Sequence, residues 1–239
     1  MQYNPYGIQA LWSQGDLVIK SVAFLLLIMS IASWYVMATL IWRAFILRRA
    51  AHATADFWHA QNFDEGLQIL GQAGDANQFR HLAEEGQAAV EHYTKSNHTH
   101  LHDQLSLADW LNACLRGAID EGAERLQRGL PILASVGSTA PFVGLFGTVW
   151  GIYHALVGIG ISGQASIDKV AGPVGEALIM TAFGLAVAIP AVLGYNALTR
   201  ANKGIIGRMN HFAHQLHAYF LTGAPVARNG MTTARMEES

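Results

Sequence analysis

Apolar residues are concentrated in three long runs, each bounded by polar sequence. The first lies between Lys20 and Arg43, and the second extends from Gly129 to Ile167 without a Lys, Arg, Asp or Glu. A helix needs about 20 consecutive apolar residues to cross a membrane. The pattern therefore predicts an all-α membrane protein with three transmembrane helices, at residues 18–42, 131–162 and 172–199.

The segment between the first two runs, residues 43–130, has a soluble character. It is rich in Ala, Gln and His, and it reads as helices separated by turns at GQAGDAN and KSNHTHLHD. Its last predicted helix is expected to continue into the second span, with a kink at Pro131. On this helix, opposite charges four residues apart share a face and are expected to pair: Arg116 with Asp120, Glu121 with Arg125, and Glu124 with Arg128.

The distribution of cations orients the chain. Of the 15 Lys and Arg residues, only Lys20 and Lys169 belong to the side of the N-terminus and the second loop. Cytoplasmic segments of membrane proteins carry an excess of these residues. We therefore expect residues 1–17 and 163–171 outside, and residues 43–130 and 200–239 in the cytoplasm, the last as an amphipathic helix followed by a disordered end.

Composition narrows the range of functions. Charged residues make up 13% of the chain and apolar residues 51%, which is not the balance of a soluble domain. A net charge of −2 without a basic stripe gives no support for a nucleic-acid partner. The single cysteine, Cys114, excludes an internal disulfide. Because no basic segment precedes the first apolar run, we expect that run to remain in the mature protein.

Glu176 is the one charged residue in the third apolar run. A carboxylate at membrane depth is costly, so it is a functional hypothesis by default, with a role in carrying a proton, an ion or a substrate, or only a buried hydrogen bond. At 1.5 Å per residue, Glu176 lies about 36 Å from Arg200 and Thr148 about 30 Å from Arg128. Both positions fall in the outer half of the membrane or at its edge, where the alternative for Glu176 is simple hydration.

Small residues form a stripe on each of the last two predicted spans. Such stripes let helices approach closely in lipid, where packing drives association. Each stripe includes one threonine, whose hydroxyl either joins a polar path with Glu176 or bonds back to its own helix. The stripes are Gly144, Thr148, Gly151, Ala155 and Gly158 on the second span, and Ala177, Thr181, Gly184, Ala188 and Ala191 on the third.

Three sets of histidines are further candidates for functional residues. His154, in the second span, either joins a proton path or packs as a neutral ring near the outer boundary; we favour the second interpretation. A group in the cytoplasmic segment resembles metal ligands but lacks Cys or paired acids to complete a site, so we expect a solvated loop and no metal. These residues are His92, His98, His100 and His102. The tail histidines, His211, His214 and His217, are three apart and are expected to line a helix face near lipid headgroups.

Two motifs resemble the MotA/TolQ/ExbB proton-channel family. They are PFVGLFGTVWGI, residues 141–152, and GEALIMTAFGLAVAIPAVLGYN, residues 175–196. The three-span layout with a large first cytoplasmic segment is similar to the ExbB and TolQ branches, and unlike the four-span flagellar branch. The chain departs from the family pattern before Glu176, where AGPVGEAL replaces the commoner APGIAEAL and displaces the proline by one residue.

The resemblance implies an assembly and a mechanism. Family members form a pentamer whose pore holds a dimer of a single-span partner, ExbD or TolR, which carries an aspartate. By resemblance, Glu176, Thr148 and Thr181 line the proton route, and protons are the coupling ion with no other cofactor. Such a complex lies in the bacterial inner membrane, with a periplasmic N-terminus.

The branch decides the work performed. The ExbB-type complex acts through TonB on outer-membrane uptake of iron-siderophores and vitamin B12, whereas the TolQ-type complex drives TolA and outer-membrane integrity. The tail from Thr199 is closer to the ExbB type. A passive scaffold around a conducting partner is a further alternative. An enzyme has little support, because no nucleophile–base pair, phosphate loop or Gly-x-Ser-x-Gly turn is present.

Overall fold

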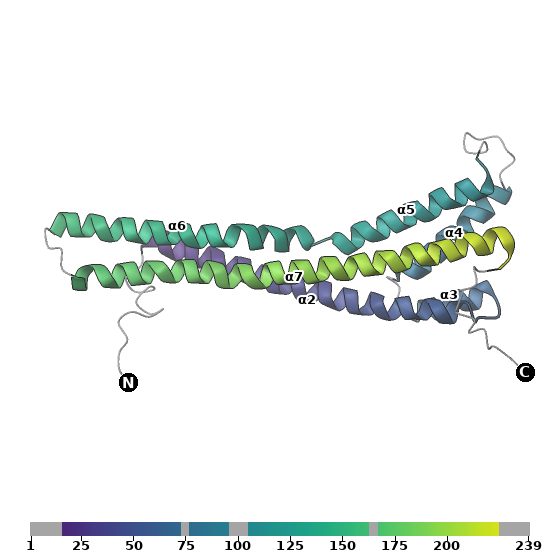
Figure 1. The fold of residues 1–239 in the computed structure, drawn as a ribbon, viewed down its shortest axis with the longest axis horizontal. Helices are drawn as coiled ribbons and strands as arrows, with labels where there is room; N and C mark the ends of the chain where they lie inside the picture. Colours follow the sequence, from purple (N-terminus) through teal and green to yellow (C-terminus); the bar gives the residue numbers. More distant parts are fainter. Residues whose placement is uncertain (1–15, 73–76, 96–104, 163–166, 225–239) are drawn as a thin grey trace, which may run out of the picture. The chain divides into compact units, whose positions relative to one another are not determined.

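The computed structural model of the chain describes residues 16–72, 77–95, 105–162 and 167–224, and the side chains of 162, 167–171, 173 and 176 are outside its described part. All secondary structure in these ranges is helical (Figure 1). The helices are α2 (Leu17–Phe57), α3 (Phe63–Gly71), α4 (Gln78–Lys95), α5 (Leu107–Gln127), α6 (Leu130–Ser162) and α7 (Ile167–Thr222).

Three stretches of these helices are long and apolar enough to cross a membrane, judged by length and composition among the described residues. They are Leu17–Phe57, Leu107–Ile161 and Ala177–Thr222. The all-α fold with three candidate spans, expected from the apolar runs, is therefore confirmed.

The chain divides into two compact units. The apolar unit consists of Met1–Arg43 and Gln127–Ala201, and the polar unit consists of Ala44–Leu126 and Asn202–Ser239. Helices α2 and α7 contribute residues to both units.

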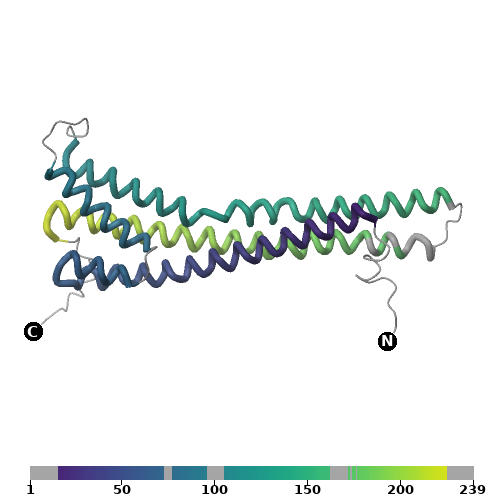
Figure 2. Tube along the Cα trace, turned by 180° about the vertical axis from the view of Figure 1, so that it is seen from behind, coloured from purple at the N-terminus to yellow at the C-terminus, as the bar shows by residue number. Residues whose placement is uncertain are grey.

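In the apolar unit, α6 and α7 lie side by side and the first part of α2 runs along them (Figure 2). The three helices meet at Gly147, where an added Cβ would lie 3.1 Å from both Val22 Cγ1 and Met180 Cβ. Large apolar side chains such as Phe142 and Ile189 point outward, with 71% and 55% of their surface exposed. Such a surface suits lipid or other transmembrane helices.

In the polar unit, the large apolar residues are inside. Phe212 of α7 is 1% exposed and packs edge-on against Phe57 of α2, with ring centroids 5.3 Å apart. Trp58 donates its indole N–H to Gln215 Oε1 at 3.0 Å, and Trp110 of α5 donates to the Ala89 carbonyl of α4 at 3.2 Å. Burial of aromatic surface thus joins helices that are far apart in sequence.

Local signals set the helix ends. Asn62 accepts a hydrogen bond from the Glu65 amide at 2.8 Å, and Ser106 accepts one from the Asp109 amide at 3.2 Å, so each caps the helix that follows. Between α5 and α6 the chain turns at Gly129, whose φ of +94° favours glycine. The continuous helix with a kink at Pro131, expected from the sequence, is therefore wrong: α5 ends at Gln127 and α6 begins at Leu130. Pro131 occupies the first turn of α6, where its missing N–H has no cost.

The predicted charge pairs on α5 are formed in part. Arg125 Nη2 lies 3.1 Å from Glu121 Oε2, as the spacing predicts. Arg116 differs: its Nε donates to Asn112 Oδ1 at 3.3 Å, and no ion pair with Asp120 occurs among the described residues. The neutral amide one turn earlier thus takes the place of the expected carboxylate.

Candidate proton-pathway site between α6 and α7

The two small-residue stripes face each other, in antiparallel register. Gly144 lies against Gly184, and Gly151 lies against Ala177. An added Cβ on Gly184 would lie 2.6 Å from the Ala140 carbonyl oxygen, and one on Gly151 would lie 2.8 Å from Ala177 Cβ. The backbones therefore approach as closely as glycine allows, which is how helices associate without a hydrophobic driving force.

The contact ends before the stripe does. Ala155 is half-buried and Gly158 is exposed, and an added Cβ on Gly158 would meet no described atom within 4 Å. On α7, by contrast, Ala188 and Ala191 are buried. Gly158 thus has no packing role within the described part of this chain.

The two threonines meet at the centre of this interface. Thr148 Oγ1 lies 2.5 Å from Thr181 Oγ1 and 2.9 Å from the Ala177 carbonyl oxygen. It also lies 3.2 Å from the Gly144 carbonyl, the acceptor expected if it bonded only to its own helix. Thr148 is 6% exposed. Back-bonding therefore accounts for one of its contacts, while the other two cross to α7.

The hydroxyl pair has a defined chemistry. A hydroxyl offers one hydrogen and two lone pairs, so Thr148 either donates to a carbonyl and accepts from Thr181, or donates its hydrogen to Thr181 and to neither carbonyl. Either arrangement leaves a chain of two hydroxyls in a site from which water is largely excluded. Such a chain can change its direction by rotating two O–H bonds.

Glu176 lies in α7, and its side chain is outside the described residues. The backbone of Glu176 is nevertheless located relative to α6, because the next residue, Ala177, packs against Gly151. Glu176 therefore lies about 7.5 Å along α7 from Thr181, toward the α6–α7 connection. Its role in a proton pathway stays a prediction.

His154 has a charged partner that the sequence pattern did not indicate. Its Nε2 lies 3.4 Å from Asp16 Oδ2, directly before α2, and its ring lies 4.7 Å from the Trp150 ring centroid. Its Nδ1 lies 3.3 Å from the Trp150 carbonyl oxygen. With 41% of its side chain exposed, His154 is placed at a surface of the unit and beside an acid. From the sequence we favoured a neutral His154 ring packed near the outer boundary, and that interpretation did not predict the contact with Asp16.

Two further features were missed from the sequence. The Ala177 carbonyl, a backbone group, is an acceptor for the central hydroxyl. Trp150 Nε1 is buried without a hydrogen-bond partner among the described residues. No sequence pattern predicts which backbone carbonyl accepts a hydrogen bond. A tryptophan within a predicted helix interface, by contrast, could have been noted from the sequence as a group that needs a hydrogen-bond partner.

The remaining histidines do not form a metal centre in the described part of the chain. No group of three or more His, Cys, Asp or Glu side chains gathers there as ligands would. His92 belongs to α4 and lies 6.0 Å from the Trp110 ring. His98, His100 and His102 are outside the described residues, so the solvated loop stays a prediction.

Comparison with known proteins identifies the family. The profile of the MotA/TolQ/ExbB proton channel family matches residues 84–211, which is more than half of the chain. The chain belongs to the MotA/TolQ/ExbB proton channel family. The resemblance of its two motifs to this family is thereby confirmed, and a member with three spans is a multi-pass membrane protein.

Relatives from two branches of the MotA/TolQ/ExbB family are similar to the chain. The biopolymer transport protein ExbB of Xanthomonas campestris pv. campestris is 45% identical over 90% of the chain and 86% of that protein. ExbB of Neisseria meningitidis is 39% identical over 90% of the chain and 97% of its own length. The Tol-Pal system protein TolQ of Pseudomonas aeruginosa is 31% identical over 91% of the chain and 95% of its length.

Proposed function

We propose that the chain is a proton-channel stator subunit of a bacterial inner membrane. It uses the proton motive force, together with an ExbD-type partner, to energise TonB-dependent uptake of iron-siderophores and vitamin B12. The observation that carries the proposal is the hydrogen-bonded pair of Thr148 and Thr181 in the close α6–α7 interface. Glu176 lies about 7.5 Å along α7 from Thr181.

Proton transfer through this site would use Glu176 as the group that takes up and releases the proton. The two hydroxyls would relay it, since each both donates and accepts. An acid is rare at membrane depth and marks ion or proton paths when it occurs. His154 and Asp16, 3.4 Å apart, are a secondary candidate for proton entry from the outer side.

One acid in three spans does not make a complete relay. We infer that the other half lies on a separate chain, an ExbD-type dimer with an intramembrane aspartate, held in the pore of a homopentamer. The exposed apolar side chains of the apolar unit, such as Phe142 and Ile189, are compatible with neighbouring subunits and lipid. The periplasmic N-terminus and cytoplasmic C-terminus are part of the same proposal.

The relatives favour an ExbB-type role over a TolQ-type role. The two ExbB proteins compared are 39% and 45% identical to the chain, against 31% for the TolQ protein. A TolQ-type subunit acting on TolA is the second candidate, since the TolQ match covers as much of the chain.

Replacement of Glu176 tests the proton role. Glu176→Gln removes the titratable proton with little change in shape, and we expect loss of TonB-dependent uptake with an assembled oligomer. Uptake of ferric siderophore by cells gives activity, and size-exclusion chromatography with the partner gives assembly. Full activity in an assembled Glu176→Gln complex would exclude the role assigned to this residue.

The hydroxyl relay is tested separately. The double variant Thr148→Val and Thr181→Val retains the branched shape, so we expect an assembled complex with strongly reduced proton conduction in reconstituted vesicles. Thr148→Ser is the matched control, because it keeps the hydroxyl. If the double variant conducts normally, the pentamer is a passive scaffold around a conducting partner.

Gene deletion separates the two branches. Loss of growth on ferric siderophore with normal detergent resistance supports the ExbB-type role. Detergent sensitivity with normal siderophore use supports the TolQ-type role and contradicts the first candidate.

A further inference from the structure

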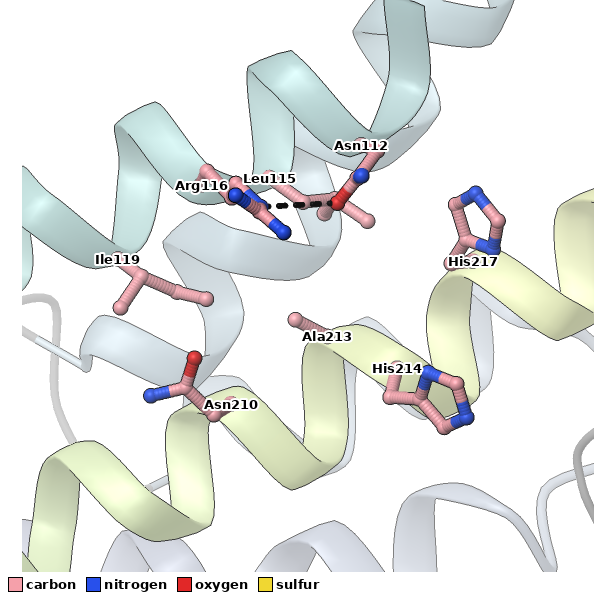
Figure 3. Close-up of a pocket in the computed structure, with 8 residues that line it drawn as sticks. All are labelled: Asn112, Leu115, Arg116, Ile119, Asn210, Ala213, His214 and His217. Atoms are coloured by element: carbon pink, nitrogen blue, oxygen red, sulfur yellow. Dashed lines mark hydrogen bonds between the residues drawn. The ribbon is translucent and has the colours of Figure 1, made fainter. Parts of the chain in front are cut away.

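A cavity of about 360 Å³ opens between α5 and α7 of the polar unit (Figure 3). Four residues of each helix line it. From α5 they are Asn112, Leu115, Arg116 and Ile119, and from α7 they are Asn210, Ala213, His214 and His217. The proposed proton pathway has no residue within the polar unit, so this cavity is separate from that pathway.

The polar lining of the cavity consists of cationic, imidazole and amide groups, with no carboxylate among the described lining residues. Arg116 is central, because its Nε is held by Asn112 Oδ1 and no ion pair joins it to Asp120 in the described part of the chain. Both Nη atoms are therefore left to donate. A guanidinium fork held in this way matches the two oxygens of a carboxylate or phosphate.

The amide groups of Asn112 and Asn210 add further hydrogen-bond donors to the cavity lining. Since Asn112 Oδ1 accepts from Arg116, its NH₂ group remains to donate. Asn210 uses one hydrogen of its amide on the Ile206 carbonyl, at 2.9 Å, and keeps the second. Figure 3 shows Asn210 and His217 extending from α7 toward α5.

His217 is fixed by the opposite helix. Its Nε2 lies 3.1 Å from the Ala108 carbonyl oxygen, which can only accept, so Nε2 carries the hydrogen. The half-buried ring thereby connects α7 to α5. His217 is one of the three tail histidines expected to line a helix face near lipid headgroups. Its side chain packs against α5 within the polar unit, and its nearness to headgroups stays a prediction.

The floor of the cavity is apolar. Leu115, Ile119 and Ala213 are buried, with 2%, 7% and 6% of their surface exposed. The volume lies within the range typical of small-molecule sites, which are mostly apolar with a few placed polar groups. A bare ion would leave most of this space unused.

We propose that the cavity binds a small organic oxyanion, in which a phosphate or carboxylate group lies on Arg116 and an apolar body lies on Leu115, Ile119 and Ala213. The ligand bridges α5 and α7, the two helices that His217 also joins. Binding at this place gives the polar unit a ligand-dependent contact between helices, independent of the proton pathway in the apolar unit.

Phenyl phosphate is a suitable probe, and isothermal titration calorimetry of the full chain in detergent is the measurement. We expect saturable binding of phenyl phosphate, weaker binding of inorganic phosphate, which lacks the apolar body, and still weaker binding of phenol, which lacks the charge. Arg116→Gln should lower the affinity for phenyl phosphate about tenfold or more, the size expected for a charged hydrogen bond.

Arg125→Gln is the matched control. Arg125 is also on α5, but it pairs with Glu121 at 3.1 Å and does not line the cavity. This variant should bind phenyl phosphate as the parent does. Equal affinity of parent and Arg116→Gln proteins, or binding of phenol as tight as that of phenyl phosphate, would overturn the proposal.

A soluble metabolite and a lipid headgroup present the same oxyanion chemistry. The titration is therefore repeated in nanodiscs of phosphatidylglycerol and of phosphatidylcholine. If phenyl phosphate fails to bind in phosphatidylglycerol nanodiscs but binds in phosphatidylcholine nanodiscs, an anionic headgroup occupies the same site. Equal binding in both identifies a soluble ligand.

Discussion

The apolar and polar units bury opposite kinds of residue. At the centre of the apolar unit, glycines and a threonine pair bring α6 and α7 together, while Phe142 and Ile189 are exposed. At the centre of the polar unit, Phe79 and Phe212 are buried, with 0% and 1% of their surface exposed.

The difference follows from the solvent of each unit. In water, removal of apolar surface drives association, so large side chains belong inside. In lipid that driving force is absent between helices, and close packing with interhelical hydrogen bonds replaces it. A substitution should therefore act through lost burial in the polar unit and through steric clash in the apolar unit. The variants below separate these two effects.

Phe212→Ala should have the largest effect. The ring is 1% exposed and contacts Phe57 and Trp58, so its loss leaves a cavity in the aromatic core. We expect the free energy of unfolding to fall by about 3–5 kcal/mol, measured by denaturant titration in detergent. Leu221→Ala, on the same helix but 40% exposed, should change it far less. Equal losses in the two variants would contradict the burial argument.

Gly184→Ala should have the next largest effect, through clash. Its Cβ would lie 2.6 Å from the Ala140 carbonyl oxygen, and backbone atoms can yield only if α6 and α7 separate. We expect a loss of about 1–3 kcal/mol and a lower melting temperature. Gly158→Ala adds the same methyl where no described atom lies within 4 Å, and should be nearly neutral.

Thr148→Val should have a smaller effect on stability. It removes the hydroxyl that contacts Thr181 and the Ala177 carbonyl, but keeps the branched shape. Interhelical hydrogen bonds in membranes contribute about 0.6 kcal/mol on average. Denaturant titration beside Thr148→Ser should resolve a difference of this size. A loss as large as that of Phe212→Ala would show that polar contacts dominate the apolar unit.

The smallest expected effect concerns the reactivity of the Cys114 thiol in the polar unit. Burial, and then the nearby Glu85 carboxylate, raise the pKa of the thiol above its ordinary value of 9.0. The thiolate is the reactive form, so alkylation of the folded protein by iodoacetamide should be slower near pH 8 than that of the denatured chain. The midpoint pH, at which the alkylation rate reaches half its maximum, should also be higher for the folded protein than for the denatured chain. Glu85→Gln should bring that midpoint partly back, and an unchanged midpoint would leave burial as the sole cause.

Much of the fold follows from linear pattern. The three spans are visible because helices of soluble proteins rarely carry about 20 apolar residues in a row. The facing stripes were also visible, since residues three and four apart share a helix face. What the pattern lacked was register: it could not show that Thr148 lies opposite Thr181 and that the stripe loses contact before Gly158.

Arg116 was expected to pair with Asp120 but bonds to Asn112; both are four residues away on α5, so spacing alone does not choose between them. Contacts between helices were missed for another reason, because each residue was judged on its own helix. His217, expected to line a helix face near lipid headgroups, bonds to the Ala108 carbonyl of another helix. His154 similarly meets Asp16, which lies 138 residues earlier in the sequence. Such choices depend on neighbours that only folding supplies.

The sequence by itself determined the class of protein, the spans and the family, because hydropathy and the two motifs are local properties of the chain. The tertiary structure decided which small residues touch, which hydroxyls meet and which partners Arg116 and Arg125 take. The physical reason is that close packing and hydrogen bonding fall off within a few ångströms, so they depend on the register between helices, which no single helix encodes.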